Sequence, residues 1–146
     1  GTGNLAARAA AAGAVVDCVE IQAGLADQLR RAGRCRRVTT ADFLSSLPDP
    51  DALYDRVIMN PPFDRERDID HVIHALEFLK PGGLLVAILS AGTEFRETRK
   101  SEAFRALMEK MNARWSDLPP GSFSSVGTNC NTIILKVFKD GRRHYW

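Results

Sequence analysis

Apolar residues follow two different periods along the chain. Short apolar runs, rich in β-branched residues, occupy residues 14–21, 54–59, 84–89 and 132–138, with a weaker run over 36–40. Runs of this length and composition predict β-strands. The run over 84–89 is uninterrupted, which is typical of a strand buried on both faces of a parallel sheet. The run over 14–21 is predicted to be a buried strand as well.

Between these runs, apolar residues recur every three or four positions, which predicts helices. An alanine-rich helix is predicted over residues 4–12, a second over 23–32 and a fourth around 104–111. The third follows the apolar positions over 69–79. Residues 80–83, Lys-Pro-Gly-Gly, are expected to end it because proline and glycine do not continue a helix.

Strands that alternate with helices predict an α/β fold with a mostly parallel sheet and helices on both faces. A length of 146 residues fits one domain, so residues 1–146 are predicted to form a single domain. Polar stretches over 91–103 and 116–129 are predicted to be connections. In such sheets ligands bind beyond the carboxyl ends of the strands, so the residues that follow each strand are candidate site residues.

The amino-acid composition is that of a globular protein, but it does not identify a binding partner. Hydrophobic residues make up 45%, charged residues 26%, and the net charge is +2, an ordinary globular mixture without a strong basic stripe. No apolar run reaches the ~20 residues of a transmembrane helix, and no signal peptide opens the chain. A soluble, cytoplasmic protein is therefore expected. Cys18, Cys35 and Cys130 are far apart in sequence, and Cys18 and Cys130 lie in apolar runs that predict buried thiols.

Histidine and basic residues offer weaker candidates. His71 and His74 lie three positions apart on one predicted helix. Without a third ligand they predict a solvated helix face, and no metal site is expected. Arg96, Arg99 and Lys100 follow the apolar run over 84–89 and are placed to contact phosphates. A solvated loop is the alternative.

Three stretches near strand ends and at the start of the first helix carry residues suited to a nucleoside ligand. Gly1-Thr2-Gly3-Asn4 opens the first helix, where glycines and free N–H groups admit a close ligand; a plain tight turn is the alternative. Glu20, beside Ile21, ends a strand and can accept hydrogen bonds from a ribose diol, or is an exposed strand-end carboxylate. Asp42 can accept from an adenine amino group while Phe43 covers the ring, or Asp42 caps a turn.

Asn60-Pro61-Pro62-Phe63 is the most informative motif. A strand that runs into two prolines lacks a structural reason, because proline cannot continue the hydrogen-bond ladder. An aromatic amine is a poor nucleophile, since its lone pair is delocalised into the ring. Hydrogen bonds to the Asn60 side-chain carbonyl and the Pro61 backbone carbonyl would draw the nitrogen toward tetrahedral geometry. Phe63 offers a face on which an extruded base can stack.

Taken in order, these motifs resemble the class I S-adenosylmethionine-dependent amino-methyltransferases. The order, with the cofactor motif before Asn-Pro-Pro-Phe, resembles the gamma-type adenine-N6 DNA methyltransferases. Residues 79–84 resemble the helix-to-strand turn of class I enzymes. Ser122-Phe123 with the stretch over 127–132 is similar to the Gly-Thr-x-x-x-Thr stretch of adenine DNA methylases, including modification subunits of restriction systems. The resemblance covers nearly the whole chain.

The resemblance implies a three-layer Rossmann-like methyltransferase sheet, mostly parallel with an antiparallel last strand. It implies S-adenosyl-L-methionine as cofactor and DNA, with base flipping, as partner. The residues implied to contact the cofactor are Gly1, Thr2, Gly3, Asn4, Glu20, Ile21, Asp42, Phe43 and Asn60. The residues implied in catalysis are Asn60, Pro61, Pro62 and Phe63.

The chain departs from the gamma-type pattern in ways that leave alternatives open. The first strand and the upstream aromatic-proline motif are absent, so a truncated start is expected. No target-recognition domain is visible. Recognition of a specific DNA sequence is therefore assigned to missing segments or to a partner subunit, or is itself in doubt. RNA bases or a protein glutamine are alternative acceptors, and a non-catalytic cofactor-binding subunit is a third reading. A nicotinamide-dependent oxidoreductase is disfavoured because it leaves Asn-Pro-Pro-Phe unexplained and the third glycine is missing.

Overall fold

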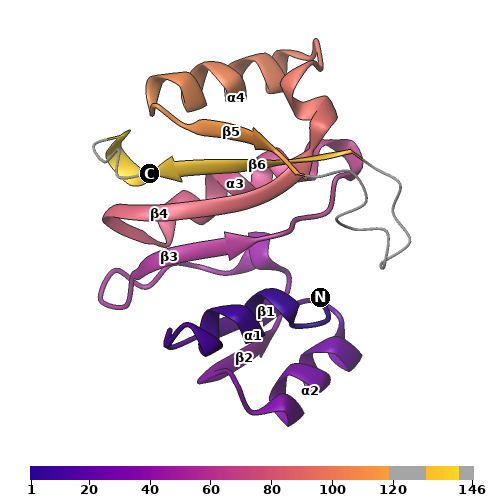
Figure 1. Ribbon diagram of the computed structural model, residues 1–146, viewed down its shortest axis with the longest axis vertical. Helices are drawn as coiled ribbons and strands as arrows, with labels where there is room; N and C mark the ends of the chain where they lie inside the picture. Colours follow the sequence, from indigo (N-terminus) through magenta and orange to yellow (C-terminus); the bar gives the residue numbers. More distant parts are fainter. Residues whose placement is uncertain (119–130, 142–146) are drawn as a thin grey trace. The chain divides into compact units, whose positions relative to one another are not determined.

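The computed structural model describes residues 1–118 and 131–141 (Figure 1). Cys130, Ser122-Phe123 and most of the stretch over 127–132 lie outside the described residues. The chain divides into two compact units, Gly1–Leu47 and Pro48–Trp146, and each is described by itself. The single domain and the missing first strand therefore stay predictions.

The first unit is a parallel pair of strands packed against a helix. Its elements are α1 (Asn4–Ala11), β1 (Asp17–Glu20), α2 (Ala23–Ala32), β2 (Arg37–Thr40) and the 3-10 turn η1 (Phe43–Ser45). Strands β1 and β2 are parallel, with Glu20 opposite Thr40 at their carboxyl ends. Ala26 and Leu29 are the buried residues of α2. The helices predicted over 4–12 and 23–32 are confirmed to within one residue.

The prediction of a buried strand over 14–21 is wrong in length and in burial. Strand β1 covers four residues, and Val15, Val19 and Ile21 are 70%, 41% and 60% exposed. Successive side chains of a strand point to opposite faces of the sheet. Helix α2 packs against one face of the β1–β2 pair, which leaves Val19 of the strand partly exposed, and Val15 and Ile21 lie outside the strand.

The second unit is a four-stranded sheet with helices. Its elements are β3 (Tyr54–Met59), η2 (Asp64–Glu66), α3 (Arg67–Glu77), β4 (Leu79–Ser90), η3 (Ala91–Glu94), α4 (Arg99–Lys110), β5 (Arg114–Asp117), β6 (Thr132–Phe138) and η5 (Lys139–Gly141). The strand order is β3-β4-β6-β5. Strand β3 is parallel to β4, whereas β6 is antiparallel to both β4 and β5. Only β6 runs against the other strands of this sheet, so the predicted antiparallel last strand is confirmed.

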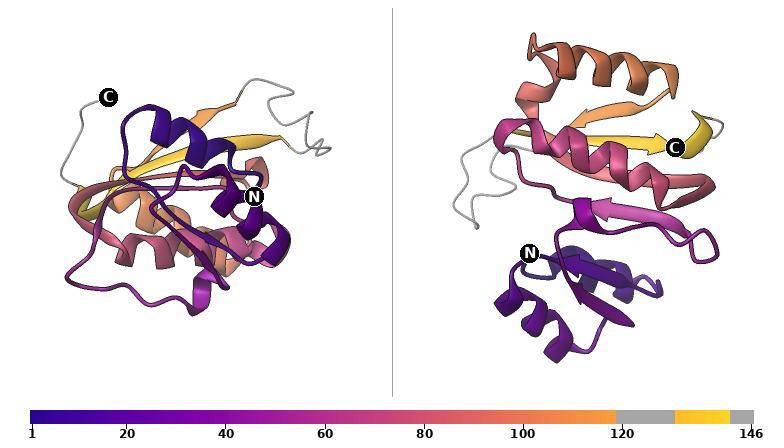
Figure 2. Two further views of the ribbon diagram at one scale, coloured as in Figure 1. Left: turned by 90° about the horizontal axis from the view of Figure 1, so that it is seen from below. Right: turned by 180° about the vertical axis from the view of Figure 1, so that it is seen from behind.

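The core of this unit lies on β4 and β6 and under α3. In the view from behind, α3 runs across the sheet (Figure 2). Over 84–89 the side chains of one face are fully buried and those of the other are half-buried, so the predicted burial on both faces is confirmed for one face and in part for the other. Phe104 of α4 contacts Trp115 of β5 edge-to-face, with ring centroids 6.2 Å apart. In the described part of the chain, none of the helices has the length and apolar character needed to cross a membrane.

Three parts of the second unit differ from the sequence prediction. Helix α4 begins at Arg99, inside the stretch over 91–103 that was predicted to be a connection. Leu79 belongs to β4, opposite Tyr54, and the next pair is Arg56 with Leu84, so residues 80–83 bulge out of the strand. A Cβ on Gly83 would lie 3.0 Å from the Lys80 carbonyl oxygen, so this bulge leaves little room for a side chain at Gly83. Strand β5 was not predicted, because its sequence Arg-Trp-Ser-Asp is polar and mostly exposed.

Candidate functional site

In the first unit, Glu20 and the glycine turn lie together. Glu20 closes β1 and is 9% exposed. Its Oε1 accepts a hydrogen bond from the backbone N–H of Gln22 at 2.8 Å, and its Oε2 contacts the Gly1 nitrogen. The exposed carboxylate considered as an alternative is therefore not what the structure has. Ile21, the next residue, is exposed beside it.

Gly3 cannot be replaced without strain, because its backbone is left-handed and it lies against Leu29 of α2. It caps the N-terminus of α1 with a φ of 89°, in the left-handed region. A Cβ at this position would lie 2.8 Å from Cδ2 of Leu29. The helix has no side-chain cap at this end, and uncapped N–H groups at a helix N-terminus favour negatively charged or oxygen-rich ligands.

The Gly3→Ala variant is expected to destabilise the protein by roughly 1–3 kcal/mol, because a left-handed non-glycine residue is costly and the added Cβ crowds Leu29. Gly24 provides the matched control. It lies inside α2, and a Cβ there meets nothing within 4 Å. Gly24→Ala is expected to stabilise by up to about 1 kcal/mol, because alanine favours helix. Urea unfolding measures both changes, and equal effects of the two substitutions would contradict the role given to Gly3.

Asp42 and Phe43 follow β2 at the same edge as Glu20. The backbone N–H of Ala41 donates to the Glu20 carbonyl oxygen at 3.2 Å, which ties the ends of the two strands together. Asp42 caps η1, where its Oδ1 accepts from the Leu44 N–H at 3.0 Å. The capping alternative is therefore correct for one carboxylate oxygen, and a ligand contact through the other is compatible with it. Phe43 is half-buried.

A hollow of about 200 Å³ begins at the glycine turn. Its lining residues are Thr2, Gly3, Asn4, Ala6, Ala7, Gln28, Leu29, Ala32, Arg34 and Cys35. It includes neither Glu20 nor Asp42, and ligand sites are usually about 300–1,000 Å³. The hollow therefore forms at most one part of a nucleoside site.

Cys18 and Cys35 form a pair that sequence spacing did not reveal. Their sulfur atoms are 3.3 Å apart, and both residues are free and half-buried. Burial and the hydrogen bond with Cys35 raise the pKa of the Cys18 thiol to about 12. The predicted full burial of Cys18 is not observed, but a thiol with this pKa stays protonated at neutral pH and is a poor nucleophile.

In the second unit, Asn60–Phe63 is held at the carboxyl end of β3. The last residue of the strand, Met59, pairs with Ala87 of β4. The Asn60 side chain is exposed, Pro61 is buried, Pro62 is exposed and Phe63 is half-buried. Asn60 is thus free to meet a ligand while Pro61 fixes the backbone that follows it.

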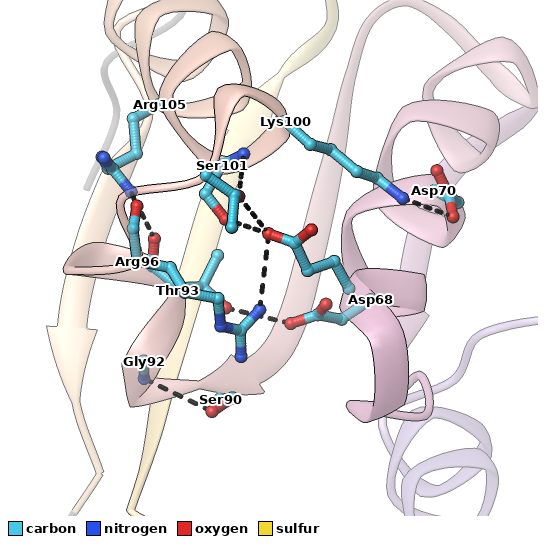
Figure 3. Close-up of polar contacts among 11 residues, drawn as sticks. Asp68, Asp70, Ser90, Gly92, Thr93, Arg96, Lys100, Ser101 and Arg105 are labelled. Carbon is cyan, nitrogen blue, oxygen red and sulfur yellow. Dashed lines mark hydrogen bonds and ion pairs between the residues drawn. The ribbon is translucent and has the colours of Figure 1, made fainter.

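The basic residues predicted to contact phosphates are partly used within the protein (Figure 3). Lys100 Nζ lies 2.8 Å from Oδ2 of Asp70, and Arg96 Nη1 lies 4.0 Å from Oε1 of Glu66. Arg99 is exposed at the start of α4. Two of the three cations therefore have carboxylate partners, which weakens the phosphate interpretation.

The prediction of a solvated face at His71 and His74 is wrong for His71, which is 6% exposed. It faces inward with Ile69 and Val72, so it belongs to the packed side of α3. His74 is half-buried, with its ring 5.1 Å from that of Phe78. In the described ranges, no group of three or more His, Cys, Asp or Glu side chains could hold a metal ion.

The structure resembles solved methyltransferases. A predicted O-methyltransferase from Agrobacterium tumefaciens matches with a TM-score of 0.67 and 20% identity, over 97% of this chain and 71% of that one. A type I restriction-modification methyltransferase subunit from Streptococcus thermophilus matches with a TM-score of 0.69 and 20% identity, over 84% and 33%. The plantazolicin methyltransferase BpumL, in complex with S-adenosylhomocysteine, matches with a TM-score of 0.60 and 9% identity, over 94% and 73%.

No family model matches the sequence, and no curated protein matches it. The likeness to solved structures therefore shows the fold alone: an α/β Rossmann-like fold with a mixed sheet, shared with methyltransferases. The predicted fold class is confirmed. The chain spans a third of the restriction-modification subunit's length, 33%.

Proposed function

We propose that this protein transfers the methyl group of S-adenosylmethionine to an exocyclic amine, with adenine N6 in DNA as the acceptor. The observation that carries the proposal is the Asn60–Phe63 segment at the carboxyl end of β3. It combines an exposed amide side chain, a buried proline and a half-buried aromatic ring. An aromatic amine needs two acceptors and a stacking face, and we assign these roles to the Asn60 side-chain oxygen, the Pro61 carbonyl oxygen and the Phe63 ring.

The first unit supplies groups suited to the cofactor. S-adenosylmethionine, when bound, supplies a methyl group on a positively charged sulfur. Glu20 is held by the Gln22 N–H at 2.8 Å and can accept from a ribose diol. Asp42 and Phe43 follow the carboxyl end of the neighbouring parallel strand. At this position Asp42 can accept a hydrogen bond from an adenine amino group and Phe43 can cover the ring. The uncapped start of α1 favours the amino-acid carboxylate of such a ligand.

The acceptor side needs no strong base. The Asn60 side-chain oxygen and the Pro61 carbonyl oxygen would accept hydrogen bonds from the two N–H groups of the amine, which would leave the nitrogen lone pair free to face the methyl carbon. With the cofactor bound, the amine nitrogen would form a bond to the methyl carbon as the carbon–sulfur bond breaks, which would leave S-adenosylhomocysteine, and the positively charged amine would then lose one proton to solvent. Preorganised dipoles lower the barrier of such a step because they do not reorganise during it.

DNA is proposed as the acceptor polymer for two reasons. Phe63, rather than tyrosine, stands after the prolines, as in the gamma-type adenine enzymes that the sequence resembles. The structural neighbours also include a restriction-modification methyltransferase subunit. The alignment spans only a third of that subunit, so we assign target-sequence reading to a further segment or partner subunit.

An acceptor panel tests the activity. The protein is incubated with methyl-labelled S-adenosylmethionine and duplex DNA, single-stranded DNA, RNA or extracted cell protein. Label is expected in DNA. Label in RNA or in protein glutamine would replace the acceptor while keeping the chemistry. Bound cofactor without label in any polymer would favour a non-catalytic subunit or a missing partner.

Phe63→Ala is expected to weaken binding of the acceptor DNA by about 1–3 kcal/mol, the usual contribution of one base–aromatic stack. Phe63 is half-buried, so part of the residue is accessible to a ligand. Phe95 is the C-terminal cap of η3 and is 73% exposed. Phe95→Ala is the matched control, because it also removes an accessible phenyl ring. Fluorescence anisotropy with a labelled duplex measures both variants. Equal affinities of Phe63→Ala and the unaltered protein would refute the stacking role.

A further inference from the structure

The residues that follow Phe63 are joined to the start of α4 by a polar network (Figure 3). Oε1 of Glu66 accepts hydrogen bonds from Thr98 Oγ1 at 2.5 Å and from Ser101 Oγ at 2.6 Å. Arg96 Nη1 lies 4.0 Å from the same oxygen. Thr98 is the N-cap of α4 and accepts from the Ser101 N–H at 3.1 Å. These four residues are called the Glu66 anchor.

The anchor is rigid on the α4 side. Ser101 is fully buried, and a carboxylate at a helix N-terminus is favoured by the helix dipole. The hydrogen bonds from Ser101 and Thr98 lower the pKa of the Glu66 carboxyl, so it is ionised at neutral pH. Charge-assisted hydrogen bonds of this kind are stronger than neutral ones. The Glu66 side chain therefore has one preferred position.

A second contact secures the same stretch of chain. Oδ2 of Asp68 accepts from Thr93 Oγ1 at 3.0 Å, and both residues are fully buried. Arg105 Nη1 donates to the carbonyl oxygens of Thr93 and Arg96 at 3.1 and 2.8 Å, which fixes the turn that carries both residues. The start of α3 is thus tied to the chain that leaves β4.

The backbone at the anchor is in an unfavourable conformation. Arg65 and Glu66 have φ values of 50° and 57°, in the left-handed region that non-glycine residues rarely adopt. Such a conformation persists only where surrounding contacts impose it, and these places are often functional. Glu66 carries both the strained backbone and the anchoring side chain. Release of the carboxylate removes the hydrogen bonds from Thr98 and Ser101 that help to hold this backbone.

We propose that Glu66 is a positioning residue, which acts through the anchor to fix the Asn60–Phe63 segment against the end of β3. The segment lies between two fixed points, the pairing of Met59 with Ala87 and the anchor at Glu66. Its acceptor oxygens can hold an amine in one geometry only if both ends are fixed. This role rests on the proposed methyl transfer, but the order of the segment is measurable without it.

Three variants of the full-length protein test the role of Glu66. Glu66→Gln keeps the size of the side chain and removes its charge. Glu66→Gly removes the side chain but suits the left-handed backbone, so it cannot fail through backbone strain. Arg65→Gly is the matched control, because it gives the same backbone freedom one position earlier and leaves the anchor intact. Asp70→Asn, which breaks the ion pair with Lys100 between the same two helices, controls for loss of a surface charge pair.

The readouts are hydrogen–deuterium exchange over residues 60–68 and the kinetics of methyl transfer to DNA. Both Glu66 variants are expected to speed exchange of this segment at least tenfold and to lower kcat at least tenfold, with the cofactor Kd within threefold. Arg65→Gly and Asp70→Asn are expected to stay within threefold in both readouts. Unchanged exchange in Glu66→Gly, or equal acceleration in Arg65→Gly, would overturn the positioning role. If the unaltered protein neither binds the cofactor nor transfers a methyl group, the proposed function fails, while exchange still decides the anchor.

Discussion

Asn60→Ala is expected to lower the rate of methyl transfer at least 100-fold. The side-chain oxygen of Asn60 is one of two acceptors proposed to localise the lone pair of the amine. Removal of one preorganised polar contact to a transition state costs about 2.7–4 kcal/mol, which corresponds to a factor of 10²–10³ in kcat. Single-turnover transfer from labelled cofactor measures the rate without interference from product release.

The same substitution is expected to leave the rest of the protein intact. The Asn60 side chain is exposed and lies beyond the last paired residue of β3, so the free energy of unfolding should change by less than about 0.5 kcal/mol. Cofactor affinity should stay within several-fold, because the cofactor groups proposed here lie mainly in the first unit. Turnover retained in Asn60→Ala would contradict the role proposed for Asn60, even if the protein proved to be a methyltransferase.

Glu20→Ala is expected to raise the Kd for S-adenosylmethionine at least tenfold. An ionised carboxylate that accepts from both hydroxyls of a ribose makes charge-assisted hydrogen bonds worth about 1.5–3 kcal/mol each. Glu20 is nearly buried and its Oε1 is already fixed by the Gln22 N–H, so little entropy is lost when it binds. Isothermal titration with the cofactor and with S-adenosylhomocysteine measures the change.

Two controls separate the ribose contact from other effects of Glu20→Ala. Asp27→Ala removes another carboxylate of the same unit, which is exposed on α2 and pairs with Arg30 at 2.7 Å. Its Kd should match that of the unaltered protein. Glu20→Gln keeps one acceptor oxygen, so its Kd should lie between those of Glu20→Ala and of the unaltered protein. An unaltered Kd in Glu20→Ala would move the ribose contact to another residue.

Much of the fold could be predicted because its strands are bounded by abrupt changes of composition. Strands β3 and β6 begin and end at the predicted residues. Leu79 was misassigned because its spacing fits both the helix before it and the strand that contains it. Strand β5 was missed because an edge strand can be polar, and its register depends on β6, which is distant in sequence.

Site residues at the ends of strands could be predicted from the sequence. Contacts between residues far apart in the sequence could not. Glu20 and Asp42 lie at one edge because neighbouring parallel strands end together. The partners of Glu66 are 32 and 35 residues away, and its left-handed backbone is not marked by glycine. Sequence spacing therefore could not reveal the anchor, nor the contact between Cys18 and Cys35.

The most direct test of methyl transfer to adenine is the mass of the product nucleoside. The protein, unaltered or as Asn60→Ala, is incubated with S-adenosylmethionine that carries a trideuterated methyl group and with unmethylated duplex DNA. The DNA is then digested and analysed by mass spectrometry. We expect trideuterated 6-methyladenine with the unaltered protein and at least 100-fold less with the variant. Deuterium recovered in another nucleoside, or in equal amounts with both proteins, would contradict the proposed chemistry at Asn60.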